Sequence, residues 1–298
     1  MKKIYLKNLL QKTSIVWWPI GFYFLVVFIL SFFGSNLEIA FSKEILQNRI
    51  LYLVAWLLCF LAFNFVTRKV WVILSFILVY ALLSVLYKET ASLNQLFFPP
   101  IDAHLLELDQ KLFGFQPSLV FSEKLNQAFF SELFFMGYFS YYLMPIAILV
   151  YLYIKFPEKI QEFAFYLIGS FVVYYLFFIL VPAYGPQFYF NAPQNQIEAQ
   201  GLFGNLIKII QKNGEAPTAA FPSSHVGIAY IMLIWLHCNK LKLRYFLAPF
   251  VFILTFSTIY IKAHWAIDSI VGLFSVALVY PLVTYIYKRI PCQYKSVK

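Results

Sequence analysis

The sequence alternates between long apolar stretches and short segments that carry most of its charge. A helix needs about 20 largely apolar residues to cross a bilayer, and eight stretches approach this length. They occupy residues 14–33, 50–66, 70–87, 133–154, 163–182, 223–238, 245–263 and 266–287. This pattern predicts an all-α, polytopic helical membrane protein with about eight transmembrane helices.

The composition agrees with this prediction. Of the 298 residues, 62% are hydrophobic and only 12% are charged, about half the charged fraction of a soluble domain. A net charge of +10 could indicate nucleic-acid binding in a soluble protein, but here the basic residues lie in short loops beside the apolar stretches. We therefore expect no nucleic-acid partner. The three cysteines show no spacing typical of metal ligands.

Basic residues divide unevenly between the two sides of the predicted membrane. The two termini and three loops near Arg68, Lys155 and Lys240 hold 15 of the 23 basic residues and only two of the 13 acidic ones. The positive-inside rule therefore predicts that both termini are cytoplasmic. The long segments 88–132 and 183–221 are then external, which in a bacterium is the periplasmic side.

The chain contains no internal repeat, so we expect a single membrane domain over residues 1–298. We divide it into an N-terminal three-helix region, residues 1–90, and a catalytic region, residues 91–298, with the chemistry in the last four helices. Apolar residues at positions 101, 105, 108 and 112 recur with helical spacing. They predict an amphipathic helix at the membrane interface.

Two histidine motifs stand out in this apolar chain, Phe221-Pro222-Ser223-Ser224-His225 and His264-Trp265-Ala266-Ile267-Asp268. The helix after His225 and the returning helix before His264 form a hairpin, which places both imidazoles on the external side. Asp268 follows His264 by four residues, so the two side chains share one side of a helix. A carboxylate there can hold the other imidazole N–H and fix the tautomer of the ring.

This arrangement suits phosphoryl transfer through a phosphohistidine, without a metal ion or another cofactor. One histidine would attack phosphorus, and the other would protonate the departing oxygen and then activate the acceptor. Ser223 and Ser224 precede a helix whose N–H groups and dipole favour an anion, so we expect them to bind the phosphate. Each motif alone is more typical of a structural histidine. Polar groups are costly in a membrane protein, however, and these two motifs share one face.

The two motifs resemble the second and third motifs of the type-2 phosphatidic acid phosphatase superfamily, Pro-Ser-Gly-His and a later His-x-x-x-Asp. The resemblance is specific over about 221–272 and loose over 100–220. It implies that His264 is the nucleophile and that Asp268 orients it. It also implies that His225 is the general acid and base for the leaving group and the acceptor.

The sequence departs from this family in informative ways. It lacks the first motif, which is Lys, six residues and Arg-Pro. Thr258 stands where the family has an arginine six residues before the nucleophile, and Ser224 replaces the motif glycine. Without these cationic phosphate clamps, a simple phosphomonoesterase is less well supported. The chain also looks like the inositol phosphorylceramide synthase-like (inositolphosphotransferase) branch, and residues 102–114 and 184–189 are similar to segments of that branch.

The leading hypothesis is a lipid phosphotransferase that moves a phosphorylated headgroup from a phospholipid to a lipid hydroxyl. The resemblance suggests phosphoinositol as the headgroup and ceramide as the acceptor. Tyr184 and Gln187 are candidate contacts to phosphate or headgroup, and Lys262 could supply positive charge. Interfacial packing and a snorkelling lysine explain these three residues equally well.

Two alternatives remain. The first is a lipid phosphate phosphatase that uses water as acceptor and acts on phosphatidic acid or a prenyl diphosphate. The same histidines and aspartate would serve both reactions. The second is a non-enzymatic transporter, which fits less well because the chain has no repeat and few charges inside the predicted spans.

Overall fold

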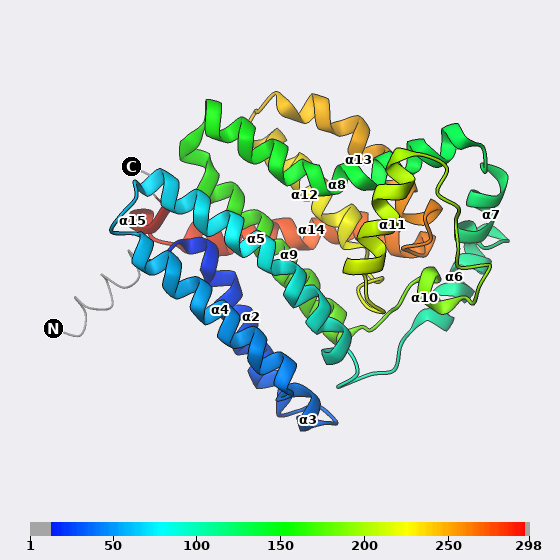
Figure 1. Ribbon diagram of the computed structural model, residues 1–298, viewed down its shortest axis with the longest axis horizontal. Coiled ribbons are helices and arrows are strands. Elements are labelled where there is room, and N and C mark those ends of the chain that lie inside the picture. The colour runs from blue at the N-terminus through cyan, green and yellow to red at the C-terminus, as the bar shows by residue number, and fades with distance from the viewer. Residues whose placement is uncertain (1–12, 296–298) are drawn as a thin grey trace.

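The computed structural model describes residues 13–295, and over that range the regular elements are all helices (Figure 1). The prediction of an all-α protein is therefore confirmed. Six segments are long and apolar enough to cross a membrane. They are α4 (Lys43–Ala62) together with the short α3 (Leu37–Ala40) before it, α5 (Arg68–Leu93), α8 (Ala128–Lys155), α9 (Ile160–Leu180) together with η2 (Pro157–Lys159), α13 (Leu243–Tyr260) and α14 (Ala266–Arg289).

The predicted number of eight spans is not confirmed, because two of them correspond to shorter helices. One is α2 (Trp18–Ser31), which follows the 3-10 turn η1 (Ile15–Trp17), and the other is α12 (Ser224–Cys238). The 15 residues of α12 give a length of about 22 Å, less than the roughly 30 Å of a hydrocarbon core. The basic residues at positions 2, 3, 7, 12 and 298, which contributed to the predicted orientation, lie outside the described residues.

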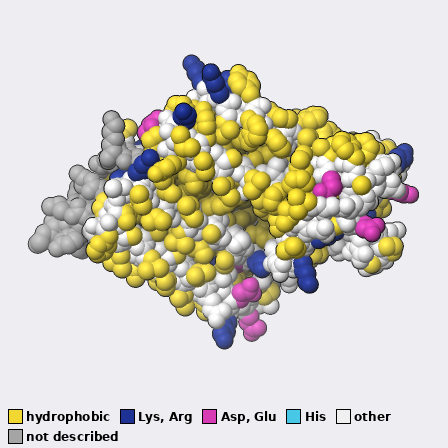
Figure 2. Space-filling model, turned by 45° about the horizontal axis from the view of Figure 1, so that its top comes forward, with side chains coloured by type: hydrophobic (Ala, Val, Ile, Leu, Met, Phe, Trp, Pro, Cys, Tyr) yellow, Lys and Arg dark blue, Asp and Glu magenta, His cyan; other side chains and the backbone are white. Residues whose placement is uncertain are grey.

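Helix α9 forms the centre of the bundle and contacts α2, α5, α12 and α14. It is the most deeply buried of the six candidate spans, whereas α4 and α13 are largely uncovered. Large apolar side chains such as Phe252 and Leu278 point outward from the peripheral helices. Figure 2 shows hydrophobic side chains over most of one face, with few charged ones among them. Such a surface is expected of helices that contact lipid.

Short helices lie at both ends of the bundle. The start of α2 lies beside α15 (Cys292–Lys295), where the rings of Trp18 and Tyr294 are 5.7 Å apart. At the opposite end in Figure 1 lie α6 (Asp102–Phe113), α7 (Pro117–Lys124), α10 (Pro186–Tyr189) and α11 (Leu202–Gly214). Helix α6 is the helix predicted from the spacing of apolar residues between 101 and 112. These four helices surround the N-termini of α12 and α14, which carry the histidine motifs.

Candidate active site

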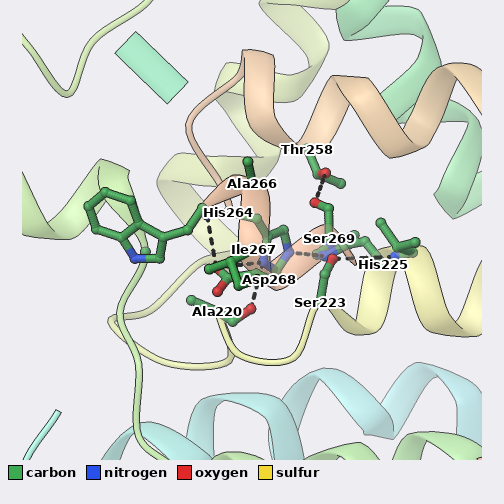
Figure 3. A network of polar contacts seen from close by, with 12 residues as sticks. Ala220, Ser223, His225, Thr258, His264, Ala266, Ile267, Asp268 and Ser269 are labelled. Carbon is green, nitrogen blue, oxygen red and sulfur yellow. Dashed lines mark hydrogen bonds and ion pairs between the residues drawn. The ribbon is translucent and has the colours of Figure 1, made fainter. Parts of the chain in front are cut away.

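The two histidines come from two different turns at the same end of the bundle. His225 is the second residue of α12, and His264 lies in the turn that joins α13 to α14. Helix α12 packs against both α13 and α14, which brings the two rings together. The Nδ1 atom of His225 and the Nε2 atom of His264 are 3.1 Å apart (Figure 3).

Backbone contacts hold the turn that carries His264. The His264 N–H donates to the Thr258 carbonyl oxygen at 3.1 Å, and Lys262 adopts a left-handed φ of 66°. The loop that contains Gln187 packs on this turn, where the Gln187 N–H donates to the Lys262 carbonyl oxygen at 2.9 Å. The His264 backbone is therefore fixed on two sides.

Gly185 allows this loop to approach so closely. Its φ is +86°, and a Cβ atom at this position would lie 2.6 Å from the carbonyl oxygen of Ala263. A left-handed backbone favours glycine in any case, and here the space for a side chain is also missing. Gly185 therefore sets the distance between the loop and the turn of His264.

A backbone carbonyl fixes the tautomer of His264. Its Nδ1 atom lies 2.7 Å from the Ala220 carbonyl oxygen, which can only accept a hydrogen bond, so Nδ1 carries the proton. The ring is almost fully buried, and burial lowers the pKa of His264 to about 4 although the Ala220 hydrogen bond acts in the opposite direction. At neutral pH the ring is therefore uncharged, and Nε2 carries a free lone pair.

Asp268 lies beneath this ring and is fully buried. Its Oδ2 atom accepts the Trp265 N–H at 2.8 Å and lies 3.7 Å from the Nδ1 atom of His264. Its Oδ1 atom is buried without a hydrogen-bond partner. The carboxylate thus stands close enough to stabilise a positive charge on His264, while the hydrogen bond that fixes the tautomer goes to Ala220.

His225 is held between His264 and two tyrosines of α8. Because Nε2 of His264 has no proton, the 3.1 Å contact requires that Nδ1 of His225 donates. The Nε2 atom of His225 then accepts from the hydroxyl of Tyr138 at 3.0 Å. The rings of Tyr138 and Tyr141 lie 4.8 and 4.6 Å from the His225 ring, measured between centroids. His225 therefore presents a proton beside the lone pair of His264.

Two aspartates of α6 position the surrounding backbone. Asp102 accepts the N–H groups of Tyr184 and Gly185 at 2.8 Å each, and the indole N–H of Trp265 at 3.0 Å. Asp109 accepts the first two N–H groups of α14, those of residues 266 and 267, at 2.8 Å each. A carboxylate at a helix N-terminus is favourable for the helix dipole. Helix α6 thus binds both the backbone of residues 184–185 and the helix α14 that frame His264.

The serines of the first motif take different positions. Ser223 is fully buried, its N–H donates to the Asp268 carbonyl oxygen at 3.0 Å, and its hydroxyl caps α12 by accepting the Val226 N–H at 3.4 Å. Ser224 lines the cavity at the histidines. Only Ser224 of the pair therefore reaches that cavity.

The position of the missing arginine also faces away from the cavity. The hydroxyl of Thr258 is buried, bonds the Thr255 carbonyl oxygen at 2.9 Å and lies 2.9 Å from the Ser269 hydroxyl. This side chain joins α13 to α14 (Figure 3). No side chain replaces the arginine charge at this point.

A cavity of about 380 Å³ opens onto the two histidines. Its walls come from α5, α8, α9, the end of α11 and the two histidine motifs, and six of the lining residues are tyrosines: Tyr80, Tyr87, Tyr138, Tyr141, Tyr142 and Tyr175. Ala81 and Ser84 also line it and are exposed on α5. The cavity therefore reaches the outer surface along a helix that is long enough to span the membrane. Among the described residues that line it, none is a lysine or an arginine.

Glu215 is the one acidic residue that lines this cavity. Its Oε1 atom lies 3.4 Å from the Tyr138 hydroxyl, so it is two contacts away from His225. Burial raises the pKa of the Glu215 carboxyl, while its contacts with Gln187 and Tyr138 and the nearby charge of Lys208 act in the opposite direction. The cavity is thus aromatic, with a single carboxyl group in its wall.

Of the remaining predicted contacts, one reaches the cavity and two do not. Gln187 lines it, and its Oε1 atom accepts from Gln211 at 3.2 Å. Tyr184 is not among the lining residues. The ammonium of Lys262 donates to the carbonyl oxygens of Gln194 and Gln196 and borders a separate polar cavity. The structure therefore does not bring Tyr184 or Lys262 to the histidine pair.

Several residues of this site were not singled out from the sequence as contributors to it. Tyr138 and Glu215 lie in an apolar helix and in a loop without a motif, and nothing local marks them. Asp102 and Asp109 lie in the segment 102–114, which was compared with the inositolphosphotransferase branch, but neither residue was assigned to the site. Within residues 13–295, no group of three or more His, Cys, Asp or Glu side chains is placed to hold a metal ion.

Comparison with known proteins gives one match. A family model described as the PAP2 superfamily matches residues 103–282, which is more than half of the chain and includes both histidine motifs. No curated protein and no solved structure matches the chain.

Proposed function

Since this chain belongs to the PAP2 superfamily, whose members are lipid phosphatases and phosphotransferases, we propose that it is a membrane lipid phosphotransferase. It would move a phosphorylated headgroup from a phospholipid to a lipid hydroxyl through a phosphohistidine at His264. The superfamily match does not single out the inositol phosphorylceramide synthase-like branch, so phosphoinositol and ceramide stay candidates for the headgroup and the acceptor.

One observation carries the proposal. The lone pair of His264 Nε2 and the proton of His225 Nδ1 meet at 3.1 Å at the wall of an aromatic cavity whose described lining residues include no lysine or arginine. A nucleophile and an acid beside each other are what phosphoryl transfer through a phosphohistidine needs. A cavity without cations is costly for the two negative charges of a phosphomonoester and less so for the single charge of a phosphodiester. This favours transfer of a headgroup over removal of a terminal phosphate.

The reaction balances with these two side chains. The negative charge of the bound donor phosphate favours the charged form of His225, which takes up a proton and is then protonated at both nitrogens. Nε2 of His264 attacks phosphorus, the bond from phosphorus to the diacylglycerol oxygen breaks, and His225 gives its Nδ1 proton to that oxygen and becomes neutral. The phosphorylated imidazole is positively charged, and Asp268 at 3.7 Å stabilises it. The acceptor hydroxyl then loses its proton to His225 and attacks phosphorus, and the P–N bond breaks. His264 regains its lone pair, and His225 regains its proton.

Water in place of the lipid hydroxyl would make the same site a phosphatase or phosphodiesterase. The cavity opens at exposed residues of α5, a helix long and apolar enough to cross a membrane, and this favours a lipid acceptor over water. The presence of this site also favours an enzyme over the transporter considered from the sequence.

The test uses the purified protein in detergent with a panel of phospholipids, with and without ceramide or diacylglycerol. We expect a new phospholipid that forms only when the acceptor is present, and its loss in His264→Ala. His237→Ala is the matched control, because His237 is exposed at the far end of α12. Release of free phosphate from a phosphomonoester without acceptor would instead establish the phosphatase. Equal activity in wild type and His264→Ala would refute the site.

A further inference from the structure

The wall of the cavity at the histidine pair indicates which headgroup it accepts, provided that the proposed headgroup transfer is correct. Six tyrosines and Phe171 give this wall aromatic rings from α5, α8 and α9, and Glu215 gives it one carboxyl group. Two lysines lie near Glu215 without lining the cavity: Lys208 on α11, whose charge influences Glu215, and Lys88 on α5, which donates to the Asn213 carbonyl oxygen. The substrate therefore meets rings and a carboxyl group, and no fixed positive charge.

Three of the six tyrosines have hydroxyl groups that are already engaged, so these three side chains offer a substrate mainly their rings. The Tyr138 hydroxyl bonds His225, the Tyr175 hydroxyl donates to the Leu83 carbonyl oxygen at 3.1 Å, and the Tyr87 hydroxyl donates to the Ala216 carbonyl oxygen at 3.5 Å. A polyol headgroup would bring several hydroxyl groups that need partners in this wall. Ring faces attract cations, and aromatic walls recognise ammonium groups.

Charge leads to the same conclusion. A phospholipid with an amine headgroup is a zwitterion with no net charge, phosphatidylinositol carries one negative charge, and phosphatidic acid carries up to two. In a cavity that contains one carboxyl group and no cation, the electrostatic cost rises in that order. The order is the same whether Glu215 is charged or neutral, because its contribution is common to all three donors. A charged Glu215 adds a direct attraction for the amine.

Glu215 is also placed at a suitable point. It follows α11 at the edge of the cavity, and the Tyr138 hydroxyl lies between its carboxylate and His225. A substrate with its phosphorus at the histidine pair would therefore extend its headgroup along Tyr138 toward Glu215. The loop of Glu215 is anchored to α5, where the Lys88 ammonium donates to the Asn213 carbonyl oxygen at 3.0 Å and the hydroxyls of Thr90 and Thr218 lie 3.0 Å apart. The carboxylate thus sits on a supported loop.

We propose that the donor lipid carries a cationic amine headgroup, phosphoethanolamine or phosphocholine, and that Glu215 and the surrounding tyrosine rings select it. Glu215 is then a specificity-determining residue, and the inositol headgroup suggested by the family resemblance is disfavoured. A primary ammonium would rely more on Glu215, and a quaternary ammonium more on the rings.

The test compares kcat/KM for donors with identical acyl chains in mixed micelles: phosphatidylethanolamine, phosphatidylcholine, phosphatidylinositol, phosphatidylglycerol and phosphatidic acid. In the wild type we expect an amine donor to be preferred over the two polyol donors, and phosphatidic acid to be the poorest. Glu215→Gln should lower kcat/KM for the amine donor by about ten-fold, because a hydrogen bond to a charged group is lost, and for the polyol donors by less than about two-fold. Glu123→Gln, an exposed carboxylate beside the separate polar cavity, is the matched control.

A second pair of variants separates the ring from the hydroxyl. Tyr142→Phe keeps the aromatic face and should retain the preference for phosphatidylcholine, whereas Tyr142→Leu should reduce it. Thermal unfolding in detergent shows whether each variant is folded, and the ratio between donors is independent of the folded fraction. These results would support the proposal.

Three results would overturn it. If Glu215→Gln lowered the rate for all donors equally, Glu215 would act through Tyr138 and His225 on catalysis and would not select the headgroup. If the folded wild type preferred phosphatidylinositol or phosphatidic acid, and His264→Ala abolished that activity, the phosphoryl transfer would stand and the amine selection would fall. If no donor reacted, the proposed function and this inference would fall together.

Discussion

Asp268→Asn tests the division of roles between Asp268 and Ala220. Asparagine keeps an oxygen that can accept the Trp265 N–H, which Asp268 accepts at 2.8 Å. It removes the negative charge that lies 3.7 Å from the His264 ring. Because the Ala220 carbonyl still holds the Nδ1 proton, the tautomer of His264 should not change. The variant therefore removes electrostatic stabilisation alone.

The size of this effect follows from the distance. Two unit charges separated by 3.7 Å interact by about 4.5 kcal/mol at an effective dielectric constant of 20. This energy corresponds to about three powers of ten in rate and is an upper limit. His264 is charged only in the transition state and in the phosphoenzyme, so the loss appears in kcat and not in KM. We expect kcat to fall by about 10²- to 10³-fold.

The assay is steady-state transfer between lipids in detergent, with Glu107→Gln on the exposed side of α6 as the matched change from carboxylate to amide. A loss of about 10⁴-fold would show that Asp268 also sets the tautomer, as expected when a carboxylate is the only partner of the imidazole. A loss below about three-fold would show that Asp268 carries no charge in the reacting enzyme. The first result would refute the reasoning from the Ala220 hydrogen bond, and the second would refute the electrostatic role of Asp268.

Three further predictions concern the same site. His225→Gln should lower kcat for phospholipid donors by about 10²- to 10⁴-fold, because the leaving oxygen loses its general acid. The loss should be much smaller for a p-nitrophenyl phosphodiester, whose leaving group needs no proton. Steady-state kinetics with both donors measures this difference. With the p-nitrophenyl donor, whose leaving group needs no proton from His225, kcat/KM should stay level from pH 7 to about pH 5 and fall as the pH drops through the His264 pKa of about 4, because protonation removes the Nε2 lone pair; a decline centred near 6.5 in a pH titration would contradict it. Gly185→Ala should lower the thermal unfolding temperature and the activity, because the new Cβ would lie 2.6 Å from the Ala263 carbonyl oxygen. Gly114→Ala is the control, since Gly114 also has a left-handed φ but open space around it. This control should cost only about 1 kcal/mol of backbone strain.

The sequence predicts the helices well where apolar length alone decides the outcome. Long stretches such as those of α5 and α14 leave no other way to satisfy the backbone in lipid. The prediction is poorer for α12, since its apolar stretch begins with the polar motif that holds His225. The hairpin argument also places His225 and His264 on one face, because two helices joined by a short turn must return to the same side.

The partners of the histidines could not be predicted in the same way. The expected partner of the His264 Nδ1 atom was Asp268, because a spacing of four residues on a helix is visible in the sequence. The structure instead puts the carbonyl of Ala220 at 2.7 Å, and a backbone carbonyl leaves no trace in the sequence. Along the chain, Tyr138 is 87 residues from His225 and 77 residues from Glu215. Such contacts depend on how α8 and α11 pack, which local periodicity does not determine.

The region that the superfamily model matches contains both histidine motifs but only some of the residues that line the cavity. The superfamily match begins at residue 103, whereas Tyr80, Ser84 and Tyr87 line the cavity from α5. Helix α5, which completes the cavity, therefore lies outside the residues that the superfamily model matches. Substrate selection can vary there while His264 and its partners stay unchanged.

This division gives a last prediction, on Tyr80. It is half-buried on α5, and its ring lies 6.4 Å from that of Phe171 on the opposite wall, measured between centroids. Tyr80→Ala removes one side of the passage along which a lipid chain reaches the histidines. We expect kcat/KM to fall more for a dioleoyl donor than for a water-soluble dihexanoyl donor with the same headgroup, because only the longer chains extend along α5. Equal losses for both donors would place Tyr80 among the headgroup contacts, and the lipid would then have to enter the cavity by a route other than α5.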